Sequence, residues 1–312
     1  MTDNSYVLIS PCRNEADFMK KTLDSVVNQS IPPTLWVIVD DGSTDDTPKI
    51  LEEYSAKYSF ITIYTRENRG HRSVGPGVIE AFYYGYDQIK LQDFDFICKL
   101  DLDLIMPTIY FENLIQRMND NPRIGNCSGK PYYIDKVTGN LVSEGCGDEN
   151  AIGASKFYRR QCFEEINGFI RQVMWDGIDG HRCRQLGWVA VSWDDPELRF
   201  THLRPMGSSQ KNIVTGRIRH GFGQYFMGTG IVYMLASVIF RFFHPPYLIG
   251  GLAMFWGYIK SALTQVPRFE DKELRQFINK YQWACLFKGK TQATADLNKQ
   301  QAAVWQKTHG DV

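Results

Sequence analysis

The sequence predicts an α/β fold in which a mostly parallel sheet is flanked by helices. In the first third of the chain, short apolar runs typical of buried strands alternate with stretches of helical spacing. Clusters of polar residues follow three of the four runs. Ligands of such sheets bind beyond the carboxyl ends of the strands, so we expect the functional site at that edge.

The expected elements follow in chain order. The four strands are predicted at residues 6–10, 36–39, 60–64 and 94–104. Helical spacing covers residues 18–27 and 68–85, and a further helix begins near Pro48, a residue that suits a first helical turn. The segment before it, 40–47, supplies a glycine turn and residues that favour helix N-caps.

The fourth apolar run ends in two aspartates, Asp101 and Asp103. If the strand continued to its end, both carboxylates would lie on one face. Two like charges at a buried strand end repel each other and lose hydration, so a cation would stabilise them. Mg²⁺ and Mn²⁺ accept oxygen ligands and leave positions for substrate phosphates. The alternative is a solvated strand exit with two surface carboxylates.

Composition argues against several classes of protein. The 312 residues carry a formal net charge of zero, which gives no support for nucleic acid as a partner. The seven cysteines are odd in number and form no C-x-x-C pair, so we expect free thiols in a reducing compartment and no zinc site. The first strand begins without a basic and apolar leader, so no secretory signal is expected.

A series of motifs carries further information. In order, they are PCRNE at 11–15, VDDGSTDDT at 39–47, NRG at 68–70, DLD at 101–103, ASKFYRR at 154–160, INGF at 166–169 and WDGIDGHRCRQLGW at 175–188. As an ordered set, they resemble the inverting glycosyltransferases of family 2, which have the GT-A fold. The resemblance implies a nucleotide-activated sugar, a UDP- or GDP-sugar, as the donor.

The resemblance also implies a nucleotide pocket at the ends of the first strands. Asp40 would accept a hydrogen bond from the base, while Asp41 would support the turn. Arg72 would reach the diphosphate or the base, or else would lie exposed at a helix start. The other expected lining residues are Pro11, Arg13 and Glu15. For Arg13 and Glu15 the alternative is a surface ion pair.

By the same resemblance, Mn²⁺ or Mg²⁺ would neutralise charge on the departing nucleoside diphosphate. Asp103 would hold the ion, and Asp101 would touch the ribose or the water shell of the metal. His202 is either a further metal ligand or a structural histidine, and imidazole suits Mn²⁺ better than Mg²⁺. Arg204 would hold the diphosphate, and residues 207–211 would form a mobile lid.

A carboxylate must accept the proton of the acceptor hydroxyl as that hydroxyl attacks. Family members carry Glu-Asp before a Gly-aromatic pair, and counting back from Gly187 places the catalytic base on Asp176. Trp175 stands where the family has glutamate, which leaves an aromatic surface that could stack on a sugar. Asp179 is the rival base, although a charge in a first helical turn also favours the helix dipole.

The composition changes in the last third of the chain. We expect a GT-A catalytic domain at 1–210 and a helical region at 211–312, in which residues 222–259 are apolar and aromatic. This segment suggests helices in the membrane interface or a shallow re-entrant hairpin, and the alternative is a helical pair packed on the catalytic domain. Residues 269–290 predict an amphipathic helix, and those from Thr291 look polar and loosely ordered.

Together these expectations describe a metal-dependent, inverting glycosyltransferase. Its partners would be a nucleotide-sugar, a lipid-linked or polysaccharide acceptor and a membrane surface, with no nucleic acid. It would act on the cytoplasmic side of the plasma membrane as a peripheral or monotopic protein. The alternatives are a nucleotidyltransferase, which would normally show a glycine-rich basic loop after the first strand, and a non-catalytic sugar-nucleotide-binding protein.

Overall fold

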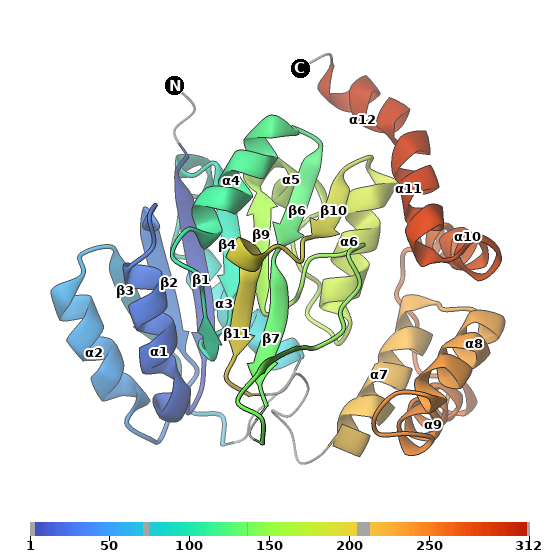
Figure 1. Cartoon of the computed structure of the whole chain (residues 1–312), viewed down its shortest axis with the longest axis horizontal. Coiled ribbons are helices and arrows are strands. Elements are labelled where there is room, and N and C mark those ends of the chain that lie inside the picture. Colours follow the sequence, from blue (N-terminus) through green and yellow to red (C-terminus); the bar gives the residue numbers. More distant parts are fainter. Residues whose placement is uncertain (1–3, 71–74, 136, 205–212, 311–312) are drawn as a thin grey trace.

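The computed structural model describes residues 4–70, 75–135, 137–204 and 213–310. A seven-stranded sheet has the order β10-β6-β9-β4-β1-β2-β3, and a second sheet has the order β5-β11-β7-β8. Figure 1 shows the large sheet at the centre with helices on its two faces, and the C-terminal helices beyond its β10 edge. The expected α/β architecture with a mostly parallel sheet is confirmed.

The strands β1 to β4 pair in parallel around β1, as the alternation of strands and helices predicts. The strands of the large sheet are β1 (Tyr6–Cys12), β2 (Leu35–Asp40), β3 (Ile61–Thr65), β4 (Phe96–Leu100), β6 (Ile124–Ser128), β9 (Ser155–Arg159) and β10 (Val189–Ser192). Within this sheet β9 runs antiparallel to both of its neighbours, β4 and β6.

Helices cover both faces of the large sheet because its strands are apolar on both sides. Along β1, Tyr6 and Leu8 enter one core with side chains of α1, α2 and α4, and Val7 and Ile9 enter the other core with side chains of α3, α5 and α6. These helices are α1 (Ala16–Val27), α2 (Thr47–Lys57), α3 (Pro76–Tyr86), α4 (Tyr110–Asp120), α5 (Arg160–Glu165) and α6 (Trp175–Gln185).

The second sheet was not anticipated from the sequence. It contains β5 (Leu104–Ile105), β7 (Lys130–Ile134), β8 (Leu141–Ser143) and β11 (Arg199–His202). Two short 3₁₀ turns, Leu91–Asp93 and Pro196–Leu198, precede β4 and β11. The strands of the second sheet are short, and most of them pair with strands far away in the sequence. The local sequence therefore gives little indication that this sheet forms. This sheet matters for the site because β11 carries His202 and leads to Arg204.

Two predicted elements are shorter than expected. The strand expected at 94–104 forms only as Phe96–Leu100, so Asp101 and Asp103 follow the strand and do not share a pleated face. The helix expected from residue 68 begins at Pro76, because Gly70 and Gly75 both adopt positive φ angles, +77° and +92°, that a helix cannot contain.

The C-terminal helices are α7 (Ile213–Met227), α8 (Ile231–Phe242), α9 (Ile249–Leu263), α10 (Lys272–Lys288), α11 (Lys290–Gln300) and α12 (Ala302–His309). The predicted boundary between the catalytic domain and the helical region, at residue 210, lies within 205–212 and therefore outside the described residues. The helix predicted at 269–290 is confirmed as α10. No helix within the described residues combines the length and the hydropathy needed to cross a bilayer.

The expectation of a loosely ordered segment after Thr291 is wrong. α12 returns to the part of the chain that forms the large sheet, where the rings of Trp305 and Trp188 pack edge to face, 5.8 Å apart. His309 Nε2 lies 3.0 Å from Glu165 Oε1. Gly187 makes the approach possible, since a Cβ there would lie 2.6 Å from the backbone nitrogen of Trp305. Contacts of Trp305 and His309, together with the hydrogen bond of Arg123 to the Asn298 carbonyl, thus hold a polar segment in place.

Replacing Trp305 by alanine should lower the free energy of unfolding by about 3–5 kcal/mol, because a buried aromatic side chain leaves a cavity. Trp305 is 5% exposed, whereas Trp283 on α10 is 44% exposed and serves as the matched control. Urea denaturation of Trp305→Ala and Trp283→Ala measures the difference. Equal, small losses would show that α12 does not contribute to the stability of the fold.

Candidate functional site

The loops that leave β1 and β2 are joined by hydrogen bonds. The backbone nitrogen of Asn14 donates to Ser43 Oγ at 2.8 Å, and Thr44 N donates to Asn14 Oδ1 at 2.8 Å. Glu15 N donates to Thr47 Oγ1 at 2.9 Å. Asn14 adopts a φ of +53°, a conformation that asparagine tolerates. The polar residues at 40–47 therefore hold the 11–15 loop in place.

Asp40 and Asp41 have different surroundings. Asp40 is buried, and its Oδ1 accepts a hydrogen bond from Ser43 N at 2.9 Å. Asp41 pairs with Arg66 at 2.8 Å and with Arg69 at 2.6 Å. Arg13 donates to the Asp41 backbone carbonyl, which fixes its guanidinium at this edge of the sheet. Asp41 therefore supports the loop.

Asp103 is at the centre of an ion-pair network built from three distant segments. Arg204 Nε donates to Asp103 Oδ2 at 2.8 Å, and Arg204 Nη2 lies 2.8 Å from Glu15 Oε2. Glu15 directly precedes α1, and Arg204 follows β11. One guanidinium thus bridges two buried carboxylates, and three residues expected in the donor site come together.

His202 extends this network to a residue that the sequence analysis missed. Its Nε2 lies 3.6 Å from Asp103 Oδ2, and its Nδ1 lies 3.3 Å from Glu144 Oε2. Burial alone would lower the His202 pKa, but the two carboxylates outweigh it and raise that pKa to about 10. Burial would likewise raise the Asp103 pKa, but His202 and Arg204 lower it to about 2. The imidazolium and the carboxylate stabilise each other.

Asp101 faces away from this network and toward a buried lysine. Lys99 Nζ lies 2.5 Å from Asp101 Oδ1 and donates to the Gly153 carbonyl at 3.0 Å. The same ammonium lies 5.4 Å from the centre of the Trp175 ring. Burial raises the Asp101 pKa, and the charge of Lys99 offsets only part of this effect. Lys99 connects the Asp101 turn to the start of α6.

Asp176 lies in the first turn of α6, beside Gly153. A Cβ on Gly153 would come within 2.9 Å of Asp176 Oδ2, so the glycine lets this carboxylate keep its position. The backbone carbonyl of Asp176 accepts hydrogen bonds from Asn150 at 2.8 Å and from Lys156 at 2.7 Å. Within the described part of the chain, its carboxylate oxygens accept no hydrogen bond. They are therefore open to a ligand.

Asp179 has the opposite environment, although it lies less than one helical turn away. Its carboxylate is 1% exposed and lies 2.5 Å from Lys156 Nζ. The Tyr158 hydroxyl also donates to it. Burial raises the Asp179 pKa, and Lys156 counteracts this rise. This buried pair positions α6 and leaves Asp179 without access to an acceptor hydroxyl.

The residues expected to bind a metal fit only in part. Asp103 and His202 converge, and after loss of the Nε2 proton of His202 they would supply one carboxylate oxygen and one imidazole nitrogen, a donor set that suits Mn²⁺. Asp101 is turned toward Lys99. In residues 4–70, 75–135, 137–204 and 213–310, no three histidine, cysteine or acidic side chains form a group that could hold a metal. A two-residue site completed by diphosphate oxygens and water remains compatible with this geometry.

Some predicted site residues lie outside the described residues: Arg72 and residues 207–211. Three further residues of the site, Glu144, Lys99 and Lys156, were not predicted from the sequence. Glu144 follows the short strand β8 and belongs to no motif of the sequence analysis, so its contact with His202 reveals it. Lys99 and Lys156 did carry a signal, because each is a lysine inside an apolar strand, and a buried lysine needs an anionic partner.

The chain shows similarity to known proteins at three levels. The model of glycosyl transferase family 2 matches residues 7–182. The poly-beta-1,6-N-acetyl-D-glucosamine synthase of Staphylococcus epidermidis is 26% identical over 126 residues, which cover 40% of this chain and only 28% of the relative. That of Staphylococcus aureus strain MSSA476 is also 26% identical over 126 residues, with the same coverage of both chains.

Two solved structures show the same fold at low identity. The 1–349 fragment of S. aureus TarS bound to UDP-GlcNAc superposes with a TM-score of 0.52 at 13% identity, over 97% of this chain and 91% of that one. GalNAc-T7 with UDP, GalNAc and Mn²⁺ gives a TM-score of 0.58 at 14% identity, over 88% and 53%. Because the family model covers more than half of the chain and the site residues lie at the expected strand ends, the protein belongs to glycosyl transferase family 2 and has a GT-A fold.

Proposed function

We propose that the protein is an inverting glycosyltransferase that transfers a sugar from a UDP- or GDP-sugar to a lipid-linked or polysaccharide acceptor, with Asp176 as the general base. The observation that carries this proposal is the contrast between two neighbouring carboxylates. Asp179 is buried and neutralised by Lys156, whereas the Asp176 carboxylate is accessible beside Gly153. A carboxylate that pairs with no cation among the described residues is free to accept a proton.

The reaction would proceed in one displacement. The acceptor oxygen forms a bond to the anomeric carbon while its proton passes to Asp176. The bond from that carbon to the donor phosphate oxygen breaks, and the nucleoside diphosphate departs with the electron pair. A single displacement inverts the anomeric centre, and no protein nucleophile takes part. The rigid hold of Asn150 and Lys156 on the Asp176 backbone orients the base.

The residues around Asp103 would hold the departing diphosphate. A divalent ion bound by Asp103 and His202 would supply Lewis-acid stabilisation of the leaving group. Arg204 is a cation suited to phosphate oxygens and is held at the site by its contacts with Asp103 and Glu15. Pro11 lies near the end of β1, where Cys12 pairs with Asp40, so this end of β1 and the following Arg13 lie beside Asp40 for the nucleoside. The relatives support a nucleotide-sugar donor, since TarS and GalNAc-T7 were solved with UDP-GlcNAc and with UDP and Mn²⁺.

The attachment of the protein to the cytoplasmic face of the plasma membrane is also a proposal. It rests on exposed apolar side chains of α8, of α9 and of the loop between them, a surface that we call the apolar face. Its members include Ile231, Val232, Leu235, Ile239, Phe240, Phe243, Tyr247, Leu248, Leu252 and Trp256. Exposed apolar side chains of this number favour a lipid bilayer, and Arg241 and Lys260 in the last turns of α8 and α9 would meet anionic headgroups.

Asp176→Asn should lower transfer by about a hundredfold or more, because an amide cannot accept the proton, while donor binding persists. A panel of UDP- and GDP-sugars with Mn²⁺ first identifies the donor, since a true ligand raises the melting temperature. Released nucleoside diphosphate and the NMR spectrum of the product then report transfer and inversion. Release of pyrophosphate would instead indicate a nucleotidyltransferase.

The matched variant for this test is Asp179→Asn, which lies on the same helix. It should lower stability because it leaves the buried Lys156 without its charge partner. Its folded fraction should keep more activity than Asp176→Asn. Abolished transfer in folded Asp179→Asn together with active Asp176→Asn would reverse the assignment, and a product with retained configuration would refute the inverting mechanism.

Asp103→Asn should weaken the Mn²⁺-dependent affinity for UDP or GDP by at least about tenfold, since it removes an anionic ligand while keeping the shape. Isothermal titration with Mn²⁺ and with EDTA provides the internal control. In EDTA the variant and the wild type should bind the nucleotide alike. If the Mn²⁺-dependent affinity is unchanged in the variant, Asp103 is not a metal ligand.

The full-length protein should float with liposomes at low and high salt, because the attachment is mainly apolar. Phe240 and Trp256 are 61% and 55% exposed, and each should contribute about 1.5–3 kcal/mol when buried in lipid. The double variant Phe240→Ser, Trp256→Ser should therefore stay in solution. Leu141→Ser, at a residue 56% exposed on β8, is the control and should float. A wild-type protein that ignores liposomes would contradict the membrane proposal.

A further inference from the structure

Two buried lysines lie directly opposite each other in the large sheet. Lys99 of β4 pairs with Lys156 of the antiparallel strand β9, so both side chains leave the same face of the sheet. Lys99 is 3% exposed, and Lys156 is fully buried. Like charges in this arrangement repel each other and lose hydration, so neighbouring groups must compensate both ammonium groups.

Each lysine joins its strand to a different part of the site. Lys99 contacts the carboxylate of Asp101 and donates to the carbonyl of Gly153 at 3.0 Å. Lys156 contacts one carboxylate of α6 and donates to the backbone carbonyl of Asp176 at 2.7 Å. Lys99 therefore holds the turn that follows β4, and Lys156 holds the helix that carries the proposed base.

The ring of Trp175 covers both ammonium groups. Its centre lies 5.4 Å from Lys99 Nζ and 5.7 Å from Lys156 Nζ. At such distances the negative face of an indole attracts a cation. Phe169 packs edge to face against the same indole, with 4.7 Å between the ring centres. Trp175 is therefore a fixed partner that the two lysines share.

Trp175 does not have the role that the sequence suggested. It is 8% exposed, so it does not offer an aromatic surface on which a sugar could stack. The charges of Lys99 and Lys156 are already balanced by two carboxylates, and an uncharged ring preserves this balance. The glutamate that the family carries at this position would add a negative charge without a partner, which is costly in a buried site.

We propose that Trp175 is a positioning residue that fixes the base, Asp176, relative to the donor side of the site through Lys99 and Lys156. This inference rests on the proposed function and deepens it. Lys156 holds the backbone of Asp176, and the Asp176 carboxylate lies against Gly153, which Lys99 holds. Loss of the ring would loosen both lysines and hence both contacts of the base. A displacement of about 1 Å can lower a catalytic rate by about a hundredfold.

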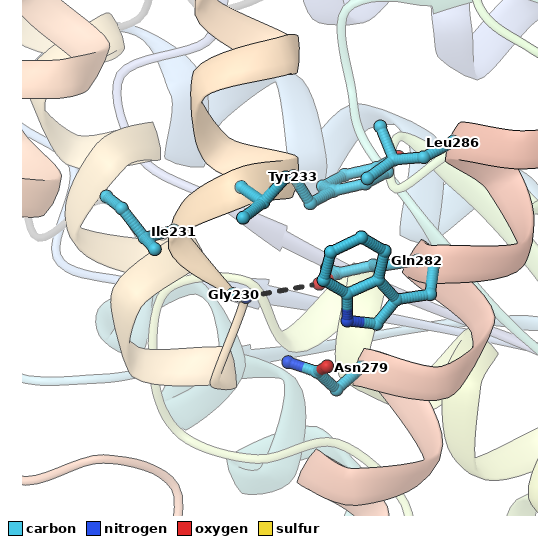
Figure 2. Close-up of a pocket in the computed structure, with 8 residues that line it drawn as sticks. Gly230, Ile231, Tyr233, Asn279, Gln282 and Leu286 are labelled. Atoms are coloured by element: carbon cyan, nitrogen blue, oxygen red, sulfur yellow. Dashed lines mark hydrogen bonds between the residues drawn. The ribbon is translucent and has the colours of Figure 1, made fainter.

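The helix α6 has a second anchor that does not involve Trp175. Ile178 of α6 packs in a buried cluster with apolar side chains of α10. α10 is in turn tied to the start of α8, because Gln282 Oε1 accepts a hydrogen bond from Gly230 N at 3.3 Å, as Figure 2 shows. Variants of Trp175 should therefore keep α6 folded, so that a loss of activity reports the position of Asp176.

The test uses the full-length protein and the same transfer reaction as for Asp176→Asn. Trp175→Leu keeps an apolar side chain without a ring, Trp175→Phe keeps a ring, and Trp175→Glu introduces the residue of the family. The matched control is Trp193→Leu, since Trp193 is half-buried and has the guanidinium of Arg117 over its ring at 4.7 Å. Isothermal titration with UDP or GDP and Mn²⁺ gives the fraction of each variant that is folded and binds nucleotide.

Trp175→Leu should lower kcat at least about tenfold and change the KM for the donor less than about twofold, because it displaces the base and leaves the donor pocket intact. Trp175→Phe should keep more activity, since a benzene ring also attracts a cation. Trp175→Glu should lose at least as much as Trp175→Leu, because its carboxylate would draw a lysine away from its carbonyl partner. Trp193→Leu should keep kcat.

A double-mutant cycle separates positioning from a general effect on the fold. In the Asp176→Asn background, Trp175→Leu should lower the residual rate less than about twofold, since the base through which it acts is already absent. A variant that only destabilised the protein would lower the rate by the same factor in both backgrounds.

A second readout does not depend on activity. In protein labelled at the lysine ε-carbons, the ring of Trp175 should shift the ε-proton resonances of Lys99 and Lys156 upfield in the NMR spectrum. Trp175→Leu should abolish both shifts, and Trp193→Leu should preserve them. Lysine resonances that are not shifted in the wild type would show that the ring does not cover the ammonium groups and would overturn the proposal.

Three activity results would also overturn it: wild-type kcat in Trp175→Leu, an equal loss in both backgrounds, or full activity of Trp175→Glu. The failures of the two proposals can be told apart. Unimpaired transfer by Asp176→Asn would refute the proposed base and this inference with it. Inactive Asp176→Asn together with fully active Trp175→Leu would refute the positioning role alone.

Discussion

The arrangement of the site depends on one buried carboxylate. Asp103 accepts a hydrogen bond from Arg204 and lies against His202, and Arg204 reaches Glu15, a residue 189 positions away in the sequence. Glu144 pairs with the other side of His202, so that negative and positive side chains alternate through the whole network. No member could be buried alone, since an isolated charge in a protein interior is costly. Their mutual pairing brings the exits of β1, β4 and β11 to one place.

The same principle separates the two carboxylates at the start of α6. Asp179 and Asp176 lie in one short segment, yet Lys156 neutralises only Asp179 through a side-chain contact while binding Asp176 through its backbone carbonyl. One lysine therefore anchors the helix and leaves the other carboxylate available. Pairs of acidic groups with contrasting environments commonly divide structural and chemical roles. Met174, with a φ of +68°, ends the preceding loop in a strained conformation and points α6 toward the site.

Much of the fold follows from local pattern. The first four strands, the helices between them and the polar exits were predictable, because apolar periodicity and turn residues act over a few positions. The shortened fourth strand was less predictable, since Leu102 is apolar and buried although it lies beyond the strand. The second sheet and the α12 contact escaped prediction because their pairings join distant segments. The terminal helix α12 is held by Trp305 and His309, which both pack on Trp188.

The sequence by itself determined the family, the parallel sheet and the set of polar residues that end its strands, because these are properties of ordered motifs and local periodicity. Tertiary structure alone decided how those polar residues are partnered. It turned Asp101 toward Lys99 and joined Asp103 to Arg204 and His202. The physical reason is that the state of a charge depends on every group within a few ångströms, and most of those groups come from remote parts of the chain.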